Sequence, residues 1–278
     1  MKSKTAFNGV VVLTLALIIV KVLSALYRVP YQNILGDEGL YAYQQIYPIV
    51  ALGVVLSSNA LPSAYTQLVG DTHETQSVLK RLLWSLTATG FLIFIVLFVG
   101  AKSIASLMGD VHLTPMIHAA SLSFIVIGAL GLLRGHFQAK RDMHMPAYSQ
   151  VLEQSIRVGI IGVVILLFVK QDLSIYQAGT WAIIASAFGF LGATIFLWRK
   201  RDVPHNNDEM PSLPWRKFIV ATVIFAISHL IVILWQVVDS FTIVNMLRYG
   251  SGLPFKEAIT EKGIYDRGAS FIPVSYTH

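Results

Sequence analysis

Apolar residues fill this 278-residue chain in long, nearly continuous runs, unlike the short alternating runs of half-buried strands. A run of about 20 apolar residues can cross a bilayer as a helix. Lipid offers no hydrogen-bond partner to an open backbone, so such runs predict helices. The expected fold is all-α, a polytopic membrane protein with about seven transmembrane helices. The seven runs cover Phe7–Tyr27, Tyr43–Val69, Leu79–Val99, Met116–Leu133, Ala147–Val169, Tyr176–Trp198 and Phe218–Leu247.

Composition supports a membrane protein and argues against nucleic-acid binding. Hydrophobic residues make up 55% of the chain and charged residues 13%, with a mean hydropathy of +0.63. A soluble domain carries about 25% charged residues. The net charge is +6, but the basic residues stand at the ends of apolar runs rather than in one soluble patch. We therefore expect contact with anionic membrane lipids and no nucleic-acid partner.

The distribution of basic residues predicts the orientation. With the N-terminus in the cytoplasm, twelve of the 21 lysines and arginines, Arg134 among them, stand at cytoplasmic ends of the runs. Seven, including Arg28, stand at external ends. Because positive charge gathers on the cytoplasmic side, a cytoplasmic N-terminus is favoured.

A polar, proline-containing stretch divides the chain. We expect a six-helix transmembrane lobe over 1–200, a cytoplasmic linker over 201–217 and the first helix of a second lobe over 218–248. Residues 249–278 are predicted to form an external loop with a short amphipathic piece around 254–263. We expect the chain to be the N-terminal part of a longer protein that ends here in a truncated tail.

The stretch from Leu17 to Leu61 joins the first two runs, with a turn expected at 27–30. Lys21 and Arg28 are seven residues apart, about two helical turns, so both project from nearly the same face. Two interpretations remain open. Arg28 lies at the membrane interface with Lys21 extending toward it, or both line a polar cavity that receives an anion.

The fifth run carries a polar stripe. Gln150, Glu153, Gln154 and Arg157 are spaced by three and four residues and share one helix face. Glu153 and Arg157 form an i,i+4 pair with the acid first, the favourable order. The pair either neutralises itself so that the helix can insert, or faces an internal cavity; the two interpretations are compatible.

Two further positions are candidates for function. Asp239 is an acid within the seventh apolar run, and it either pairs with a cation on another helix or binds H⁺ or Na⁺. In the second run, Asn59 follows two serines and precedes Pro62. Polar residues beside a proline predict a broken or kinked helix, a common device at transporter sites.

Catalytic and metal-binding motifs of soluble enzymes are missing. The chain has no phosphate-binding glycine loop, no HExxH and no GxSxG. It contains no cysteine, and its histidines show no ligand spacing. We expect no catalytic residue, no metal and no cofactor.

Several segments resemble one transporter family. The segments are LYRVPYQNILGDEG, LPSAYTQLV, RGHFQ, then SQVLEQSIRV after a basic loop, and KGIYDRG. They are similar to the polysaccharide-biosynthesis and stage V sporulation protein B branch of the multidrug/oligosaccharidyl-lipid/polysaccharide flippase superfamily, which includes lipid II flippases. The resemblance covers about Ala6 to Arg267, with Arg28, Gly36, Arg134, Glu153, Gln154 and Arg157 in matching motifs.

This resemblance implies a lobe of a two-lobed, MATE-like fold in a bacterial plasma membrane, with a central cavity. The implied function is flipping of an undecaprenyl-diphosphate-linked saccharide, in contact with cell-wall synthesis proteins and without a chemical step. Lys21, Arg28, Glu153 and Arg157 are the expected substrate-binding residues, and Asp239 the residue for coupling to an H⁺ or Na⁺ gradient or the membrane potential. Two alternatives are a drug/cation antiporter of the same superfamily and a membrane enzyme or assembly subunit acting on the same lipid.

Overall fold

The computed structural model describes residues 2–70, 76–171, 173–202 and 214–271. Within these ranges the chain forms helices and short connections and no strand, which confirms the all-α fold class. The helices are α1 Lys2–Val55, α2 Leu61–Gly70, α3 Gln76–Leu107, α4 Thr114–Leu122, α5 Phe124–Ala139, α6 His144–Gln171, α7 Ile175–Lys200, α8 Trp215–Asn245 and α9 Phe255–Phe271. Short π- or 3₁₀-helical segments are η1 Leu56–Ala60, η2 Val111–Leu113 and η3 Met246–Gly250.

The chain is a multi-pass membrane protein by the length and apolarity of its helices. Five described runs are long and apolar enough to cross a membrane, and a sixth is counted if the bent pair Trp215–Ile231 and Ile233–Gly250 is one span. The first of these runs, Val11–Val69, has 59 residues and contains the second predicted segment and most of the first. Each of the seven predicted apolar segments is therefore helical.

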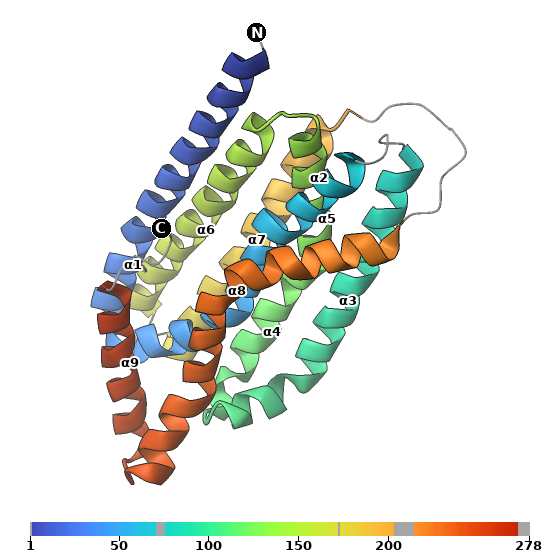
Figure 1. Ribbon diagram of the computed structural model, residues 1–278. Coiled ribbons are helices and arrows are strands. Elements are labelled where there is room, and N and C mark those ends of the chain that lie inside the picture. Colours follow the sequence, from blue (N-terminus) through green and yellow to red (C-terminus); the bar gives the residue numbers. More distant parts are fainter. Residues whose placement is uncertain (1, 71–75, 172, 203–213, 272–278) are drawn as a thin grey trace.

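The turn predicted at 27–30 is wrong. The helix continues through Pro30 and breaks at Gly36, whose φ of 70° lies in the left-handed region that favours glycine. Proline is tolerated within a membrane helix because neighbouring groups satisfy the freed carbonyl. As Figure 1 shows, the chain changes direction below the first half of α1 and returns toward α2. The break at Gly36 thus sets the two halves of α1 against each other.

The central helices pack through close backbone approaches. α6 packs on α7 and α1, while α5 packs on α2 and α3. A Cβ atom at Gly128 of α5 would lie 2.7 Å from the Leu86 carbonyl oxygen, and one at Gly135 would lie 2.8 Å from Tyr65 Cβ. Small residues therefore allow α5 to lie against its neighbours, as at many membrane helix interfaces.

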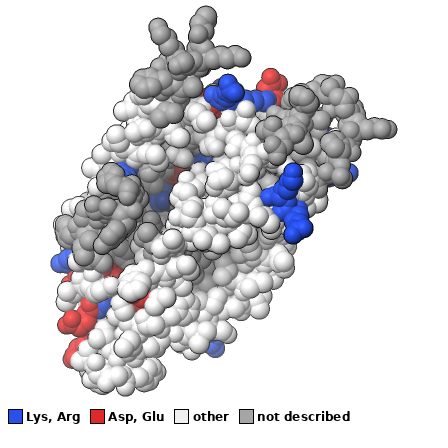
Figure 2. All heavy atoms as spheres, viewed as in Figure 1, with Lys and Arg blue, Asp and Glu red and all other residues white. Residues whose placement is uncertain are grey.

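The face seen in Figure 2 is mostly uncharged, with acidic and basic side chains mixed over α9. This helix covers the predicted amphipathic piece and extends beyond it to Phe271. The predicted linker over 201–217 lies mostly outside the described residues, as does the end of the tail over 272–278.

Candidate functional site

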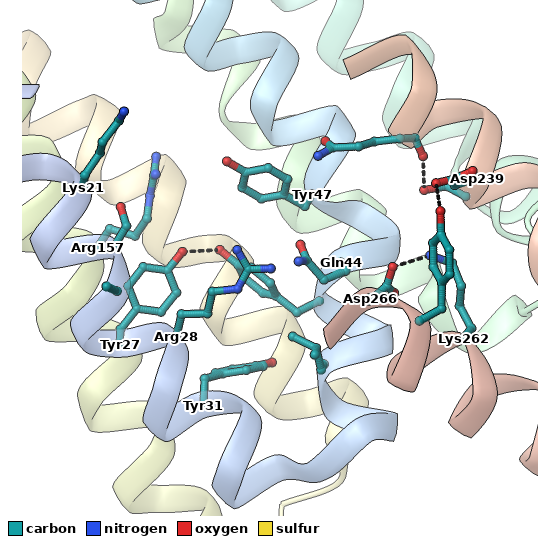
Figure 3. A pocket seen from close by; sticks show the side chains of 17 residues that line it. Lys21, Tyr27, Arg28, Tyr31, Gln44, Tyr47, Arg157, Asp239, Lys262 and Asp266 are labelled. Carbon is teal, nitrogen blue, oxygen red and sulfur yellow. Dashed lines mark hydrogen bonds and ion pairs between the residues drawn. The ribbon is translucent and has the colours of Figure 1, made fainter. Parts of the chain in front are cut away.

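A pocket of about 520 Å³ opens between α1, α6, α8 and α9 (Figure 3). Its lining is polar: Ala25 and Leu40 are the only aliphatic residues in it among the described part of the chain. The lining residues are Lys21, Ser24, Ala25, Tyr27, Arg28, Tyr31, Leu40, Tyr43, Gln44, Tyr47, Arg157, Gln236, Asp239, Ser240, Lys262, Tyr265 and Asp266. A volume of this size is typical of ligand-binding pockets.

The two cations of the first half of α1 both line this pocket. Lys21 is exposed and Arg28 is half-buried, and Ser24 lies between them on the same face. The helix is continuous through these positions, so the two-turn spacing holds. Both residues thus lie beside a polar cavity, one of the two placements that the sequence left open, and their contact with an anion stays a prediction.

Behind the pocket wall lies a buried ionic cluster of Arg134, Glu153 and Arg157, here called the inner cluster. Glu153 Oε2 accepts from Arg134 Nη2 at 2.8 Å, and its Oε1 accepts from Arg157 Nη2 at 3.1 Å. Ser58 and Ser149 accept from the other Arg134 nitrogens, at 2.8 and 2.9 Å. One carboxylate thus joins α5 to α6 and holds the arginine that reaches the pocket.

Gln154 ties this cluster to α1. Its Nε2 donates to Ser24 Oγ at 2.8 Å, and its Oε1 accepts from Arg157 Nη1 at 3.1 Å. The Arg157 guanidinium also lies 5.5 Å from the centre of the Phe190 ring. A chain of hydrogen bonds therefore runs from Arg134 to the face of α1 that carries Lys21 and Arg28.

Three predictions about charge are settled by these positions. The i,i+4 pair of Glu153 and Arg157 is confirmed, and Arg157 lines the pocket. Glu153 does not line it and is bonded to Arg134 and Arg157 behind the pocket wall, so its contact with a substrate stays a prediction. Arg134, expected at the cytoplasmic end of a run, is fully buried, and its guanidinium donates to three side-chain acceptors inside the fold.

The other end of the pocket holds Asp239 of α8 with Lys262, Tyr265 and Asp266 of α9, here called the outer cluster. Asp239 Oδ2 accepts from the Tyr265 hydroxyl at 3.1 Å, and Lys262 pairs with Asp266 one turn further along α9. Burial raises the pKa of the Asp266 carboxyl to about 6, against the lowering by Lys262. Asp239 thus accepts a hydrogen bond from a phenol of a neighbouring helix. The sequence had suggested a cationic side chain, H⁺ or Na⁺ as its partner.

The motif residues of α1 and α2 have structural places. Gly36 makes the break in α1. Asn59 lies in the π-helical segment η1, and Pro62 follows in α2; the backbone is helical on both sides of η1, so the second run is locally irregular there rather than broken. Pro62 lies under α5, where a Cβ at Gly135 would come within 3.1 Å of its Cα. None of these three residues lines the pocket.

Sequence reasoning missed two groups in the lining. No role was assigned from the sequence to four tyrosines of α1, Tyr27, Tyr31, Tyr43 and Tyr47. Lys262, Tyr265 and Asp266 lie within the quoted motif KGIYDRG, but mixed charge there indicated an external segment. The i, i+4 spacing of each tyrosine pair was the available signal, because it places each pair on one helix face.

The net charge of the lining is positive. It has four cations, Lys21, Arg28, Arg157 and Lys262, and two carboxylates, Asp239 and Asp266. Inside an apolar helical protein, such a group of charges favours an anionic or zwitterionic polar ligand.

Comparison with known proteins agrees with this architecture. Residues 6–274 match the model of the family described as polysaccharide biosynthesis protein. An uncharacterized membrane protein, YabM of Bacillus subtilis, is 37% identical over 273 residues. Stage V sporulation protein B and the lipid II flippase MurJ of the same organism are 31% and 28% identical over 211 and 222 residues.

These matches cover 94%, 71% and 72% of this chain. The chain spans about half of YabM (51%) and 39% and 40% of the other two relatives. No solved structure matches it. Because the family model matches nearly all of its residues, the chain belongs to the polysaccharide biosynthesis protein family.

Proposed function

We propose that the protein carrying this chain flips an undecaprenyl-diphosphate-linked saccharide from the cytoplasmic to the outer leaflet of a bacterial plasma membrane. The observation that carries this proposal is the pocket itself, which is polar and net cationic within an apolar helical protein. A relative named as a lipid II flippase supports the same cargo class.

The pocket suits the polar head of the cargo and not its apolar tail. The diphosphate contacts Lys21, Arg28 and Arg157 through charge-assisted hydrogen bonds, for which the planar guanidinium is well suited. The polyprenyl tail stays in lipid, since the lining has only two aliphatic residues. No covalent step is needed, and the protein acts as a transporter rather than an enzyme.

Movement of the head requires the pocket to open to each side in turn. We place the N-terminus in the cytoplasm and assign energy coupling to an H⁺ or Na⁺ gradient or to the membrane potential, with Asp239 as the coupling residue. Cell-wall synthesis proteins are the expected suppliers and users of the cargo.

The two alternatives lack support from the lining. An antiporter for cationic drugs calls for an excess of acidic lining residues, whereas here cations exceed carboxylates. An enzyme calls for a nucleophile, base or metal site beside the bound lipid, and the two carboxylates of the lining, Asp239 and Asp266, are already bonded to Tyr265 and Lys262. The pocket lining therefore fits a flippase, which moves its cargo without changing it chemically, better than it fits either alternative.

The test uses cells depleted of their lipid II flippase and supplied with the complete open reading frame that encodes this chain. Rescue by the parent and loss of rescue by Arg28→Ala, at equal membrane abundance, are the expected results. The matched control is Lys102→Ala, an exposed cation of α3 outside the pocket, which keeps rescue. Rescue that survives Arg28→Ala contradicts the cationic site, and conversion of labelled lipid to a new product contradicts a flippase.

A further inference from the structure

One part of the pocket lining is aromatic. Tyr27 and Tyr31 come from the first half of α1, and Tyr43 and Tyr47 from the second half. Tyr43 stands at the centre: its ring centroid lies 6.4 Å from that of Tyr27, 5.2 Å from Tyr31 and 6.2 Å from Tyr47. These four residues are here called the tyrosine wall.

The members of the wall are not equally available. Tyr31 and Tyr43 are 1% and 6% exposed, and Tyr43 shares a hydrogen bond of 3.2 Å with the Tyr27 hydroxyl. Tyr47 is half-buried and projects into the open space of the pocket in Figure 3. Tyr27 is half-buried as well, but its hydroxyl is engaged with Tyr43, so Tyr47 is the member best placed to contact a ligand.

The lining also holds hydrogen-bonding groups that are not used within the fold. Gln236 Oε1 and the Tyr31 hydroxyl are buried without a partner among the described residues, and both belong to lining residues. Gln44 lies on the same face of α1 as Tyr47, three residues before it. A buried polar atom without a partner costs free energy, so a ligand or water that supplies partners stabilises this part of the pocket.

Flat apolar rings with polar groups at their edges match the chemistry of a sugar. A pyranose presents C–H groups on its face and hydroxyl or acetamido groups around its rim. Tyrosine offers a large rigid surface with a polar tip at low entropic cost. An acyl or polyprenyl chain lacks the rim groups that Gln44, Gln236 and Tyr31 would bond.

We propose that the tyrosine wall, with Tyr47 as its contact residue and Gln44 and Gln236 beside it, is the saccharide subsite of the pocket. It lies next to Arg28 and Arg157, which bind the diphosphate of the same cargo. This inference rests on the proposed function and extends it: cations bind the linker, and the tyrosine wall distinguishes a sugar-bearing lipid from the bare diphosphate.

The test measures binding of two probes to the complete protein in nanodiscs, lipid II and undecaprenyl diphosphate. The parent is expected to bind lipid II more tightly. Tyr47→Ala is expected to lose about tenfold in affinity for lipid II, the size of one stacking contact, and to keep its affinity for undecaprenyl diphosphate. Tyr47→Phe retains the ring and is expected to keep most of the preference.

Two further variants separate the subsite from the diphosphate site. Arg28→Ala is expected to weaken both probes alike, while Tyr148→Ala, an exposed tyrosine outside the pocket, changes neither. Equal affinity of the parent for both probes, or a preference that survives Tyr47→Ala, overturns the saccharide subsite and leaves the flippase proposal standing. Binding of neither probe overturns both.

Discussion

The inner and outer clusters use similar polar groups at the two ends of one pocket, but they are built differently. In the inner cluster, Arg134 is fully buried and all its nitrogens donate to side chains of other segments. In the outer cluster, Asp239 is half-buried and Tyr265 is 44% exposed. We call the inner cluster closed because it is buried and bonded to several segments. We call the outer cluster open because part of it is exposed to solvent.

This difference follows from where the partners come from. Glu153 joins arginines of two helices, with serines of η1 and α6 completing the shell of Arg134. Lys262 and Asp266 instead pair one turn apart within α9, a helix of polar composition. A buried pair costs desolvation, and extra hydrogen bonds are needed to offset it. The inner cluster therefore serves as a scaffold, while the outer cluster suits a part that moves or titrates.

The largest effect is expected from Glu153→Ala. The change leaves two buried guanidinium groups without their shared carboxylate, and breaking a buried pair in this way costs about 3–5 kcal/mol. We expect a large drop in the thermal unfolding midpoint of the purified protein and in its membrane abundance.

The matched change in the outer cluster is Asp239→Ala, which removes a half-buried carboxylate bonded to a phenol. It is expected to lower the same midpoint far less than Glu153→Ala. Equal losses for the two acids would contradict the distinction between a closed and an open cluster.

The next effect concerns the packing of α9 against α1. A Cβ atom at Gly263 would lie 2.1 Å from the Asp37 carbonyl oxygen, so Gly263→Ala forces the backbone of α9 away from α1. We expect a loss of about 3 kcal/mol, the upper part of the range for overpacking, because the obstructing atom is backbone. Gly268→Ala is the control, since a Cβ there meets nothing within 4 Å. Thermal unfolding of both variants decides whether α9 is seated as described.

A smaller effect is expected from pH. With the pKa of Asp266 raised to about 6, the folded protein holds a proton that the unfolded chain releases near its usual value of 3.8. The contribution of Asp266 to stability therefore falls as pH rises from about 4 to about 6, by on the order of 2 kcal/mol. The charged groups that act on it are Lys262, Asp239 and Arg28.

Asp266→Asn removes the titrating carboxyl group. It is expected to flatten the dependence of the unfolding midpoint on pH within that window. Glu257→Gln, an exposed acid of the same helix, is the control and should keep the slope of the parent. A slope unchanged in Asp266→Asn would assign the pH dependence to another group.

Periodicity within one helix was enough to predict part of this site. The spacing of Lys21 and Arg28 placed both on the pocket face, and the spacing of Glu153 and Arg157 gave their ion pair. Both inferences need only helix geometry, which an apolar run of this length guarantees.

Contacts between helices could not be predicted from the sequence. The burial of Arg134 depends on Ser58, which is 76 residues away in the chain, whereas the sequence showed only a basic residue at the cytoplasmic end of an apolar run. The break at Gly36 rather than at Pro30 depends on a backbone conformation that glycine permits but does not require. The tyrosine wall forms only because that break brings both halves of α1 to the same pocket.

The smallest effect is the difference in stability loss between two Tyr→Phe changes, at Tyr265 and at Tyr41. Each of these tyrosines donates to a carboxylate. Tyr41 is fully buried and donates to Asp110, which also accepts from Tyr176. Tyr265→Phe loses one bond at an exposed position and is expected to cost about 0.5 kcal/mol, whereas Tyr41→Phe disturbs a buried acceptor and is expected to cost about 1–3 kcal/mol. Thermal unfolding of the two variants measures the contrast. A larger loss from Tyr265→Phe would mean that the bond to Asp239 holds α9 at the pocket, and that the outer cluster is as closed as the inner one.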